Sequence, residues 1–595
     1  MAVGAQTLRI EETLLDPPAL PAPPTRHALL VILIALAALL HLATLGSGDL
    51  YSQTEGQYAG AAREMIQAHH WLLPTNDGIP RLQKPPLLYW LLIISFKLFG
   101  MNSAAARLPI ALSIVASVTL IFLIGEKLSS YWRGFFAGLI YLSFCGTYLL
   151  ARIVMPEPLF SMWITAAIFC GVCGYQRRHY RRAWFAGFWI CAALACLTKG
   201  LLGLIYPATV LLLLAILYRE ARIRFRALLR WDYLAIFCLI LLPWHIWAEW
   251  RFPGYFRYLT SSEWIGHVRG LSDATHDFVG MPVYQFLIMH FAWWFPWSFA
   301  LLPGLIFAWR RVLRPREIDF IDALALCWIG IVFIPLLFLG QRQDYYSMSM
   351  WGGLALGAAT VWDRMPNQWR CFGAALVGVV GAMSGALAIF LSNAAKSLNG
   401  DWGVMDERWT AWRALHDMPS STWLTFRPML VIIALSLVLL SVVALYFLSK
   451  QREKLAAIAL VGAMIPTGLS MIDGVGRMAP YFSLADLARF LNTHVNKHIL
   501  FEGPLDDSSS LIFYLNRKFL LVNQNPLKEA PIGTPSTDTF LDEEAVLKKW
   551  GDPEAVYLIV EQSRLSHWTK VLTERFHIYH QVTSSGTYVV LSNQL

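Results

Sequence analysis

A series of apolar runs recurs along this chain, the first at residues 28–45 and the last at residues 455–472. A helix needs about 20 apolar residues to cross a bilayer, and these runs approach that length. Charged residues make up 15% of the chain, whereas a soluble domain contains about 25%. The sequence therefore predicts a polytopic α-helical membrane protein.

Short clusters of Arg and Lys separate the apolar runs and predict the topology. Cytoplasmic loops of membrane proteins carry more Lys and Arg than the outer loops, so we expect these clusters on the cytoplasmic side. They lie at residues 127–133, 177–182, 219–230, 310–316, 364–370 and 450–454. Because topology accounts for the net charge of +9, no nucleic-acid partner is expected.

The alternation of clusters predicts a cytoplasmic tail at residues 1–27, about thirteen spans within residues 28–475, and a C-terminus outside. This count requires that Pro86–Gly100 does not cross the membrane. That segment has about 15 residues and contains Lys97, so it is short for a span. We interpret it as an amphipathic juxtamembrane helix within a first outer loop at residues 47–107. A fourteenth span is the competing interpretation.

The composition changes after the last apolar run, and residues 476–595 mix polar and apolar side chains. Short runs typical of strands are His498–Glu502, Ser510–Leu515, Phe519–Val522, Ala555–Val560 and Thr587–Leu591. Helical patterns cover Leu484–Leu491, Asp542–Trp550 and Ser566–Leu572. We expect a small outer α/β domain that is large enough to bury its own core.

Polar groups gather in the first outer loop, where a charged substrate carried by a lipid would arrive. Glu55 follows the first span, and Tyr58, Arg63 and Glu64 follow within one or two helical turns. Lys84 precedes two prolines that fix the local backbone. Its ammonium is a compact cation suited to a phosphate. Arg63 and Glu64 have a structural alternative, which is pairing within the loop.

A second set of candidates lies on later outer loops. Glu157 stands between Pro156 and Pro158, at the expected rim of the membrane. An ionisable residue there costs free energy unless it is paired or functional. Substrate-binding candidates on these loops are Lys199, Arg269, Tyr345 and Tyr346. The alternative for each is an interfacial anchor.

The first loop also carries a family resemblance. Its motifs are E-G-Q-Y-A-G-A-A-R-E-M from Glu55, Q-K-P-P-L-L-Y-W from Gln83 and R-L-P from Arg107. They resemble the first periplasmic loop of bacterial aminoarabinose transferases and their protein mannosyltransferase relatives. The resemblance implies a membrane glycosyltransferase of the C-type fold in the bacterial inner membrane, with its active site facing the periplasm.

The resemblance also implies the reaction. The donor would be a polyprenyl-phosphate sugar, and the acceptor lipid A or another envelope lipid or glycan. Glu55 would act as base or acceptor positioner and Glu157 as second carboxylate, while Lys84 would neutralise the departing phosphate. Tyr58 and the four later candidates would contact substrates. We expect a monomer in the lipid bilayer, and the identity of the sugar stays open.

The chain departs from the family pattern at several positions. The family has Asp-Glu where this chain has Thr54 and Glu55, and Arg in place of Gln57. It has Glu and His, implicated in metal binding, where this chain has Gln83 and Trp264. No cofactor or metal site is therefore expected, although a divalent cation stays open.

Other classes of function remain as alternatives. A transporter is disfavoured because we find no inverted repeat and no intramembrane charges of the kind that mark transporters. An O-glycosyltransferase acting on protein, and a catalytically silent lipid-binding relative, stay open.

Overall fold

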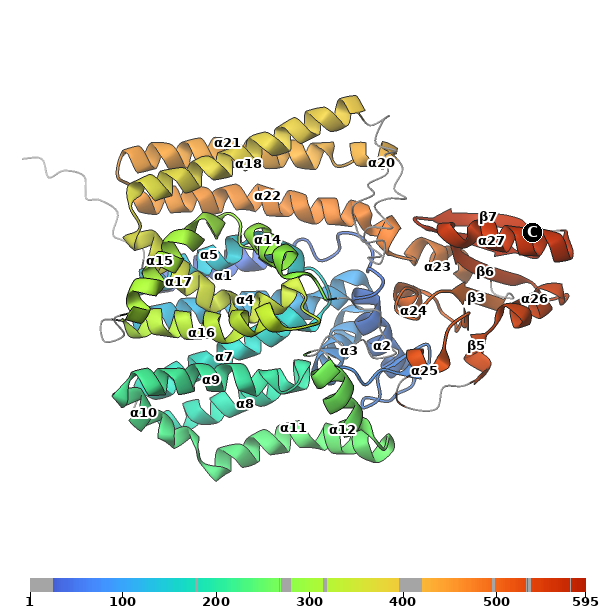
Figure 1. Cartoon of the computed structure of the whole chain (residues 1–595), viewed down its shortest axis with the longest axis horizontal. Coiled ribbons are helices and arrows are strands. Elements are labelled where there is room, and N and C mark those ends of the chain that lie inside the picture. The colour runs from blue at the N-terminus through green and yellow to red at the C-terminus, as the bar shows by residue number, and fades with distance from the viewer. Residues whose placement is uncertain are drawn as a thin grey trace, which may run out of the picture.

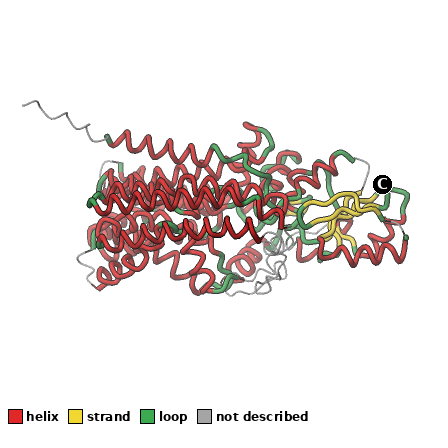
Figure 2. The backbone as a smooth tube through the Cα atoms, turned by 90° about the horizontal axis from the view of Figure 1, so that it is seen from above, coloured by secondary structure: helices red, strands yellow, loops and turns green. Residues whose placement is uncertain are grey.

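The computed structural model describes residues 25–176, 180–266, 268, 280–313, 318–394, 420–494, 498–530, 532, 537–577 and 579–594. Within these residues the chain forms a bundle of helices with a smaller α/β region at one end (Figure 1). All strands of the larger sheet lie in that region, beyond the helical bundle (Figure 2).

The bundle contains most of the helices. Its longer elements are α1 (Arg26–Leu42), α4 (Ser103–Leu128), α5 (Tyr131–Ser143), α7 (Pro156–Gln176), α8 (Arg181–Lys199), α9 (Leu202–Leu217), α11 (Trp231–Arg251), α14 (Val283–Trp293), α15 (Leu301–Leu313), α16 (Phe320–Phe338), α17 (Trp351–Arg364), α18 (Asn367–Ala394), α21 (Arg427–Ser449) and α22 (Glu453–Phe482). Among the described residues, 7 helices are long and apolar enough to cross a membrane, or up to 8 with a bent pair counted as one span. The fold class is thus a helical membrane bundle, and the count of thirteen spans stays a prediction.

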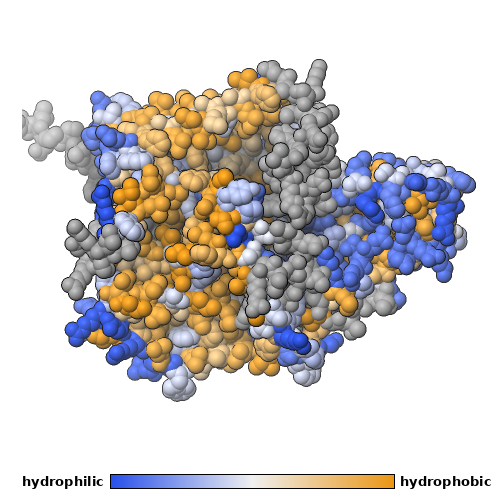
Figure 3. Space-filling model, viewed as in Figure 1, coloured by the Kyte–Doolittle hydropathy of each residue, from blue (hydrophilic) through white to orange (hydrophobic). Residues whose placement is uncertain are grey.

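The surface of the bundle agrees with a position in the bilayer. Apolar side chains cover its flank, whereas polar side chains gather at its ends and over the α/β region (Figure 3). The turns after α9, between α17 and α18, and between α21 and α22 lie at the end away from the sheet (Figure 1). These turns carry basic clusters, and the charge pattern predicts that all of them lie on the same side of the membrane.

The segment Pro86–Gly100 forms a short helix, α3 (Leu87–Phe99), beside α2 (Glu55–Gln67) and α4. One face, including Leu88 and Leu92, is buried, whereas Ile94 and Leu98 are exposed. With 13 residues it is shorter than a span. This geometry is compatible with the juxtamembrane interpretation, which stays a prediction.

The C-terminal region is built on a 6-stranded sheet in the order β5-β4-β3-β6-β8-β7. Its strands are β3 (His498–Glu502), β4 (Leu520–Val522), β5 (Phe540–Leu541), β6 (Val556–Glu561), β7 (His580–Ser585) and β8 (Tyr588–Ser592). The first four in this list pair in parallel, and β8 and β7 add antiparallel pairs. The region's larger helices are α23 (Ala485–Asn492), α24 (Ser509–Tyr514), α26 (Glu543–Gly551) and α27 (Leu565–Phe576). The α/β character predicted from the sequence is confirmed, and α22 continues through the predicted boundary at residue 476.

One predicted strand is wrong. Ser510–Leu515 was expected as a strand from its apolar and aromatic residues, but it falls mainly in the helix α24. The Arg63 guanidinium donates hydrogen bonds to the carbonyls of Ile512 at 2.8 Å and Phe513 at 3.0 Å, and also to that of Leu515. These carbonyls have no partner within a helix that ends here, so a cation from α2 stabilises the end of α24. The tertiary contact therefore overrides the local strand preference.

Helices α2 and α24 approach each other closely at two glycines of the first motif. A Cβ added at Gly56 would lie 2.4 Å from the carbonyl carbon of Ser509, and one at Gly60 would lie 3.0 Å from the Ile512 side chain. Nearby, the hydroxyl oxygens of Ser52 and Ser510 are 2.7 Å apart. The first outer loop is therefore the surface on which the C-terminal region docks.

We expect Gly56→Ala to destabilise this docking. The obstacle to the new methyl group is the backbone of Ser509, which cannot rotate away, and overpacking of this kind costs about 1–3 kcal/mol. Thermal unfolding of the purified full chain measures the loss. Gly46→Ala is the matched control, because nothing lies within 4 Å of a Cβ at Gly46. A melting temperature equal to that of the wild type would contradict the packing of α2 against α24.

Candidate active site

A polar cavity with a volume of about 160 Å³ lies where the bundle meets the C-terminal region. Its walls come from α2 and the segment after it, the start of α7, the end of α8, the 3₁₀ helix η5 (Asp344–Met350) and the loop after β3. The lining residues are Gln53, Thr54, Gln57, Tyr58, Arg81, Gln83, Lys84, Met155, Pro156, Glu157, Lys199, Gln341, Gln343, Tyr345, Tyr346 and Asp506. Segments far apart in the sequence therefore meet at one polar space.

Glu157 and Lys199 form an ion pair in the wall of this cavity. Glu157 lies in the first turn of α7 and Lys199 is the last residue of α8. Their Oε1 and Nζ atoms are 2.7 Å apart, and the side chains are 7% and 14% exposed. The Lys199 ammonium also lies 3.9 Å from the centroid of the Tyr346 ring. The contacts hold both charged groups in place while leaving the cavity lined by a carboxylate and a cation.

Two further cations line the cavity from the segment after α2. Arg81 donates a hydrogen bond from Nη2 to Gln57 Oε1 at 2.5 Å and from Nε to the Tyr89 hydroxyl at 3.1 Å. Its guanidinium carbon is 5.1 Å from the centroid of the Tyr58 ring. Lys84, which is half-buried, repels Lys199 electrostatically. An anion in the cavity would relieve that repulsion.

Two tyrosines of the cavity, Tyr58 and Tyr345, remain neutral. Burial raises the pKa of Tyr58, and burial also raises the pKa of Tyr345 well above its usual value. The rings of Tyr345 and Tyr346 meet edge to face, with centroids 5.2 Å apart. Tyr58 and Tyr345 thus add hydroxyl groups and apolar ring surface without adding charge.

Glu55 takes a different position from the one expected for a base that faces substrate. Its carboxylate pairs with Arg107 of α4 through two contacts of 2.8 Å, Nε to Oε1 and Nη2 to Oε2. The backbone amides of Val154 and Tyr51 donate to the same carboxylate at 3.2 Å and 3.1 Å. Glu55 and Arg107 are 2% and 0% exposed. The geometry therefore assigns Glu55 to a buried ion pair outside the cavity lining.

Most of the other predicted residues line the polar cavity. Six of them line the polar cavity, namely Tyr58, Lys84, Glu157, Lys199, Tyr345 and Tyr346. Arg269 lies outside the described residues. Glu64 accepts hydrogen bonds from Thr75 Oγ1 and the Gly78 amide, as a structural residue of the loop would.

Sequence reasoning missed three notable residues of the lining, Arg81, Gln343 and Asp506. Arg81 stands three residues before Lys84, just outside the motif that begins at Gln83, so its position next to the motif was a signal for it. No comparable signal marks Asp506, because its approach depends on how the C-terminal region docks.

The described residues do not fit the metal site of the family pattern. Gln83 lies in the cavity lining as a neutral amide, with its Oε1 atom buried and without a hydrogen-bond partner among the described groups. The part of the chain that the structure describes contains no group of 3 or more His, Cys, Asp or Glu side chains placed to hold a metal. The expectation of no metal stays a prediction.

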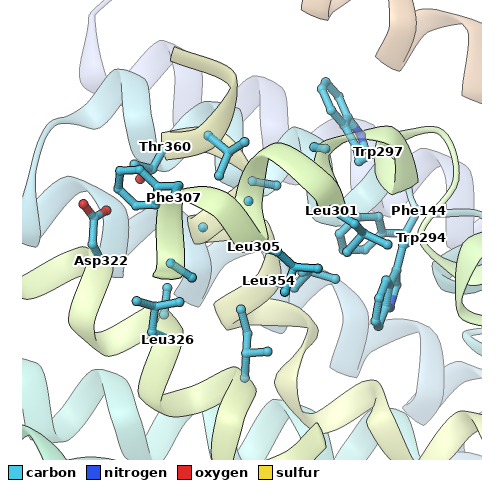
Figure 4. Close-up of a pocket in the computed structure, with 18 residues that line it drawn as sticks. Phe144, Trp294, Trp297, Leu301, Leu305, Phe307, Asp322, Leu326, Leu354 and Thr360 are labelled. Carbon is cyan, nitrogen blue, oxygen red and sulfur yellow. The ribbon is translucent and has the colours of Figure 1, made fainter. Parts of the chain in front are cut away.

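A second cavity lies within the bundle and has a different character (Figure 4). Side chains of α15, α16 and α17 line most of it. Phe144, Trp294 and Trp297 gather at one end, and Asp322 and Thr360 lie toward the other. Asp322 pairs with Arg364 at 2.9 Å. This largely apolar space lacks the set of charged groups found in the polar cavity.

Comparison with known proteins gives the family. Residues 28–259 match the family described as dolichyl-phosphate-mannose-protein mannosyltransferase. The chain is 26% identical over 395 residues to the undecaprenyl phosphate-alpha-4-amino-4-deoxy-L-arabinose arabinosyl transferase 2 of Proteus mirabilis, covering 64% of this chain and 68% of the relative. It is 30% identical over 418 residues to the corresponding transferase of Pectobacterium carotovorum, covering 66% of this chain and 72% of the relative. The chain belongs to this arabinosyl transferase family.

The fold of the chain also matches a solved structure over nearly its whole length. The crystal structure of ArnT from Cupriavidus metallidurans bound to undecaprenyl phosphate aligns with a TM-score of 0.76 and 19% identity, covering 95% of this chain and 97% of the other. The family, the C-type glycosyltransferase fold and the glycosyltransferase activity predicted from the sequence are thereby confirmed.

Proposed function

We propose that this chain transfers 4-amino-4-deoxy-L-arabinose from undecaprenyl phosphate to lipid A or another lipid or glycan of the envelope. The lining of the polar cavity supports this proposal, because it contains the cations Arg81, Lys84 and Lys199 together with Glu157. A sugar donor linked through phosphate needs cations for the phosphate and polar groups for the sugar. The names of the relatives supply the identity of donor and sugar.

The donor phosphate would bind at Lys84 and Arg81. Arg81 is held by Gln57 and Tyr89, so its guanidinium is fixed before the donor arrives. Lys84 adds a compact cation on a flexible stem. These charges would stabilise the negative charge that grows on the phosphate as the bond to the anomeric carbon breaks.

Glu157 would act on the acceptor. In a direct displacement, an acceptor oxygen attacks the anomeric carbon while the undecaprenyl phosphate leaves with the bonding electrons. The leaving phosphate is already ionised, so the reaction needs no general acid. A hydroxyl acceptor would give its proton to Glu157, which Lys199 holds at 2.7 Å. Glu55 would then support the loop through Arg107 and would not contact either substrate.

We expect Lys84→Ala to weaken donor binding as well as turnover, since its charge meets both the bound phosphate and the leaving group. The value of kcat/KM should fall by about 10²- to 10³-fold, the usual effect of losing one electrostatic contact of this kind. Lys84→Arg should recover only part of the activity. The positive charge returns, but the planar guanidinium does not occupy the same point as an ammonium. Binding of undecaprenyl phosphate and initial rates measure both effects.

The control for this series is Lys548→Ala, at an exposed lysine of α26. Unchanged affinity for undecaprenyl phosphate in Lys84→Ala would contradict the assigned phosphate site.

We also propose that the polar cavity and the C-terminal region face the periplasm. A reporter that works only outside the cytoplasm should be active when fused after Leu595, and a reporter that works only in the cytoplasm should be silent there. The same pair fused before Met1 should give the opposite result. Cytoplasmic activity at the C-terminal fusion would contradict this orientation and the span count together.

The proposed function has a direct test. The purified chain is incubated with undecaprenyl-phosphate aminoarabinose and lipid A, and mass spectrometry follows the sugar onto the acceptor. We expect transfer by a monomeric protein, and we expect it to persist when a chelator removes divalent cations. A chain that binds the donor but transfers its sugar to no envelope lipid or glycan would instead be a silent lipid-binding relative.

A further inference from the structure

The C-terminal region contributes a charged residue to the polar cavity. Asp506 lies in the loop between β3 and α24, and it lines the same space as Lys84 and Glu157. Its side chain is partly buried. The α/β region therefore forms part of the wall around the substrate and does more than dock on the bundle.

The loop that carries Asp506 is held firmly against the first outer loop. The backbone N–H of Gln53 donates to the Asp506 carbonyl at 2.9 Å and to Ser509 Oγ at 2.8 Å. The Gln53 side chain donates to the Asp507 carboxylate. Because these contacts use the backbone of Asp506 and the side chains of its neighbours, they fix the residue without using its own carboxylate.

The carboxylates that line the cavity, among the described residues, are Glu157 and Asp506. Glu157 pairs with Lys199 through Oε1, and the proposed mechanism assigns it to the acceptor. Asp506 makes no side-chain hydrogen bond and no ion pair within 4.0 Å with the rest of the described chain, although it attracts Arg81 electrostatically. Asp506 is therefore a carboxylate of the cavity lining that has no ion-pair partner within 4.0 Å in the described chain.

The sugar named for the relatives carries an amine at C4. An aliphatic amine of this kind is protonated near neutral pH, so the donor combines an anionic phosphate with a cationic sugar. We infer that Asp506 determines specificity for the aminosugar by pairing with its C4 ammonium, while the cations of the cavity bind the phosphate. This inference rests on the proposed function and adds the residue that distinguishes the aminosugar from a neutral pentose.

A simpler role predicts a different result. If Asp506 only balances the charge of Arg81, its loss disturbs the phosphate end of the cavity. Donors with and without the amine would then be affected alike. Specificity is therefore the property that separates the two roles.

The experiment compares two donors in the purified full chain, undecaprenyl-phosphate aminoarabinose and undecaprenyl-phosphate arabinose, which has a hydroxyl at C4. Asp506→Asn keeps the size of the side chain and removes its charge. We expect kcat/KM for the amino donor to fall by about 10- to 100-fold, as for the loss of a charge-assisted hydrogen bond. The arabinose donor should change by less than about threefold, since a neutral hydroxyl has no ammonium to lose.

Two variants complete the set. Asp506→Glu should recover part of the preference for the amine, because the charge returns on a longer stem. Asp552→Asn, at an exposed carboxylate of the same region, should leave both donors as in the wild type. Thermal unfolding and binding of undecaprenyl phosphate check that Asp506→Asn remains folded with its phosphate site intact.

The outcomes separate this inference from the proposed function. A wild-type chain that transfers neither sugar overturns the proposed function and the inference with it. A wild-type chain that transfers the aminosugar, with an Asp506→Asn variant that loses nothing or slows equally on both donors, overturns the inference alone. Selective loss on the amino donor supports it.

Discussion

Glu55→Gln is expected to destabilise the protein by about 3–5 kcal/mol, the cost of leaving one member of a buried ion pair without its partner. Arg107 is fully buried, and its guanidinium meets both oxygens of Glu55 at 2.8 Å. Its remaining contacts are backbone carbonyls, including those of Leu45 and Gly48. A neutral amide at position 55 cannot balance that charge. Thermal or denaturant unfolding of the purified full chain should therefore report a large loss.

The control for this prediction is the double variant Glu55→Gln with Arg107→Met, which removes both charges and replaces the arginine by a shorter, flexible apolar side chain. It should recover a substantial part of the stability, because no uncompensated charge is left. If Glu55 were the catalytic base, Glu55→Gln would instead unfold like the wild type and lose only turnover. That result would contradict the assignment of Glu55 to the fold.

Glu157→Gln should lower turnover, whereas Glu55→Gln should lower stability. Glutamine keeps the volume of the side chain and an acceptor oxygen for Lys199. The Lys199 ammonium also lies over the Tyr346 ring and lines the cavity, so the loss of stability should be smaller than at Glu55 and the protein should stay folded. It cannot accept a proton as a carboxylate does, and turnover should fall by about 10²- to 10⁴-fold, the usual contribution of a general base. Binding of undecaprenyl phosphate should change little, because the phosphate meets the cations. Glu574→Gln, at an exposed glutamate of α27, is the control.

That several candidate residues from distant loops line one cavity follows from the predicted topology. Glu157, Lys199 and Tyr346 are distant in the chain, yet the basic clusters assign their loops to one side of the membrane. Polar residues on one side of a helical bundle have few places to gather, so their convergence could be expected before their contacts were known.

The remaining features depend on contacts that local patterns do not encode. The motif around Glu55 shows a carboxylate beside a membrane, but only the fold shows that Arg107 reaches it from α4. The segment Ser510–Leu515 has the composition of a strand, and Arg63 stabilises it as the end of a helix. Asp506 reaches the cavity because Gly56 lets α24 approach α2, which no property of its own loop predicts.

A single-turnover measurement on Glu157→Gln tests whether sugar transfer takes place in the polar cavity with Glu157 as its carboxylate. Preformed complexes of the variant and of the wild type with undecaprenyl-phosphate aminoarabinose are mixed with acceptor, and release of undecaprenyl phosphate is followed. This role of Glu157 predicts a stable variant that binds the donor and transfers its sugar about 10²- to 10⁴-fold more slowly. A folded Glu157→Gln protein that transfers at the wild-type rate would contradict it.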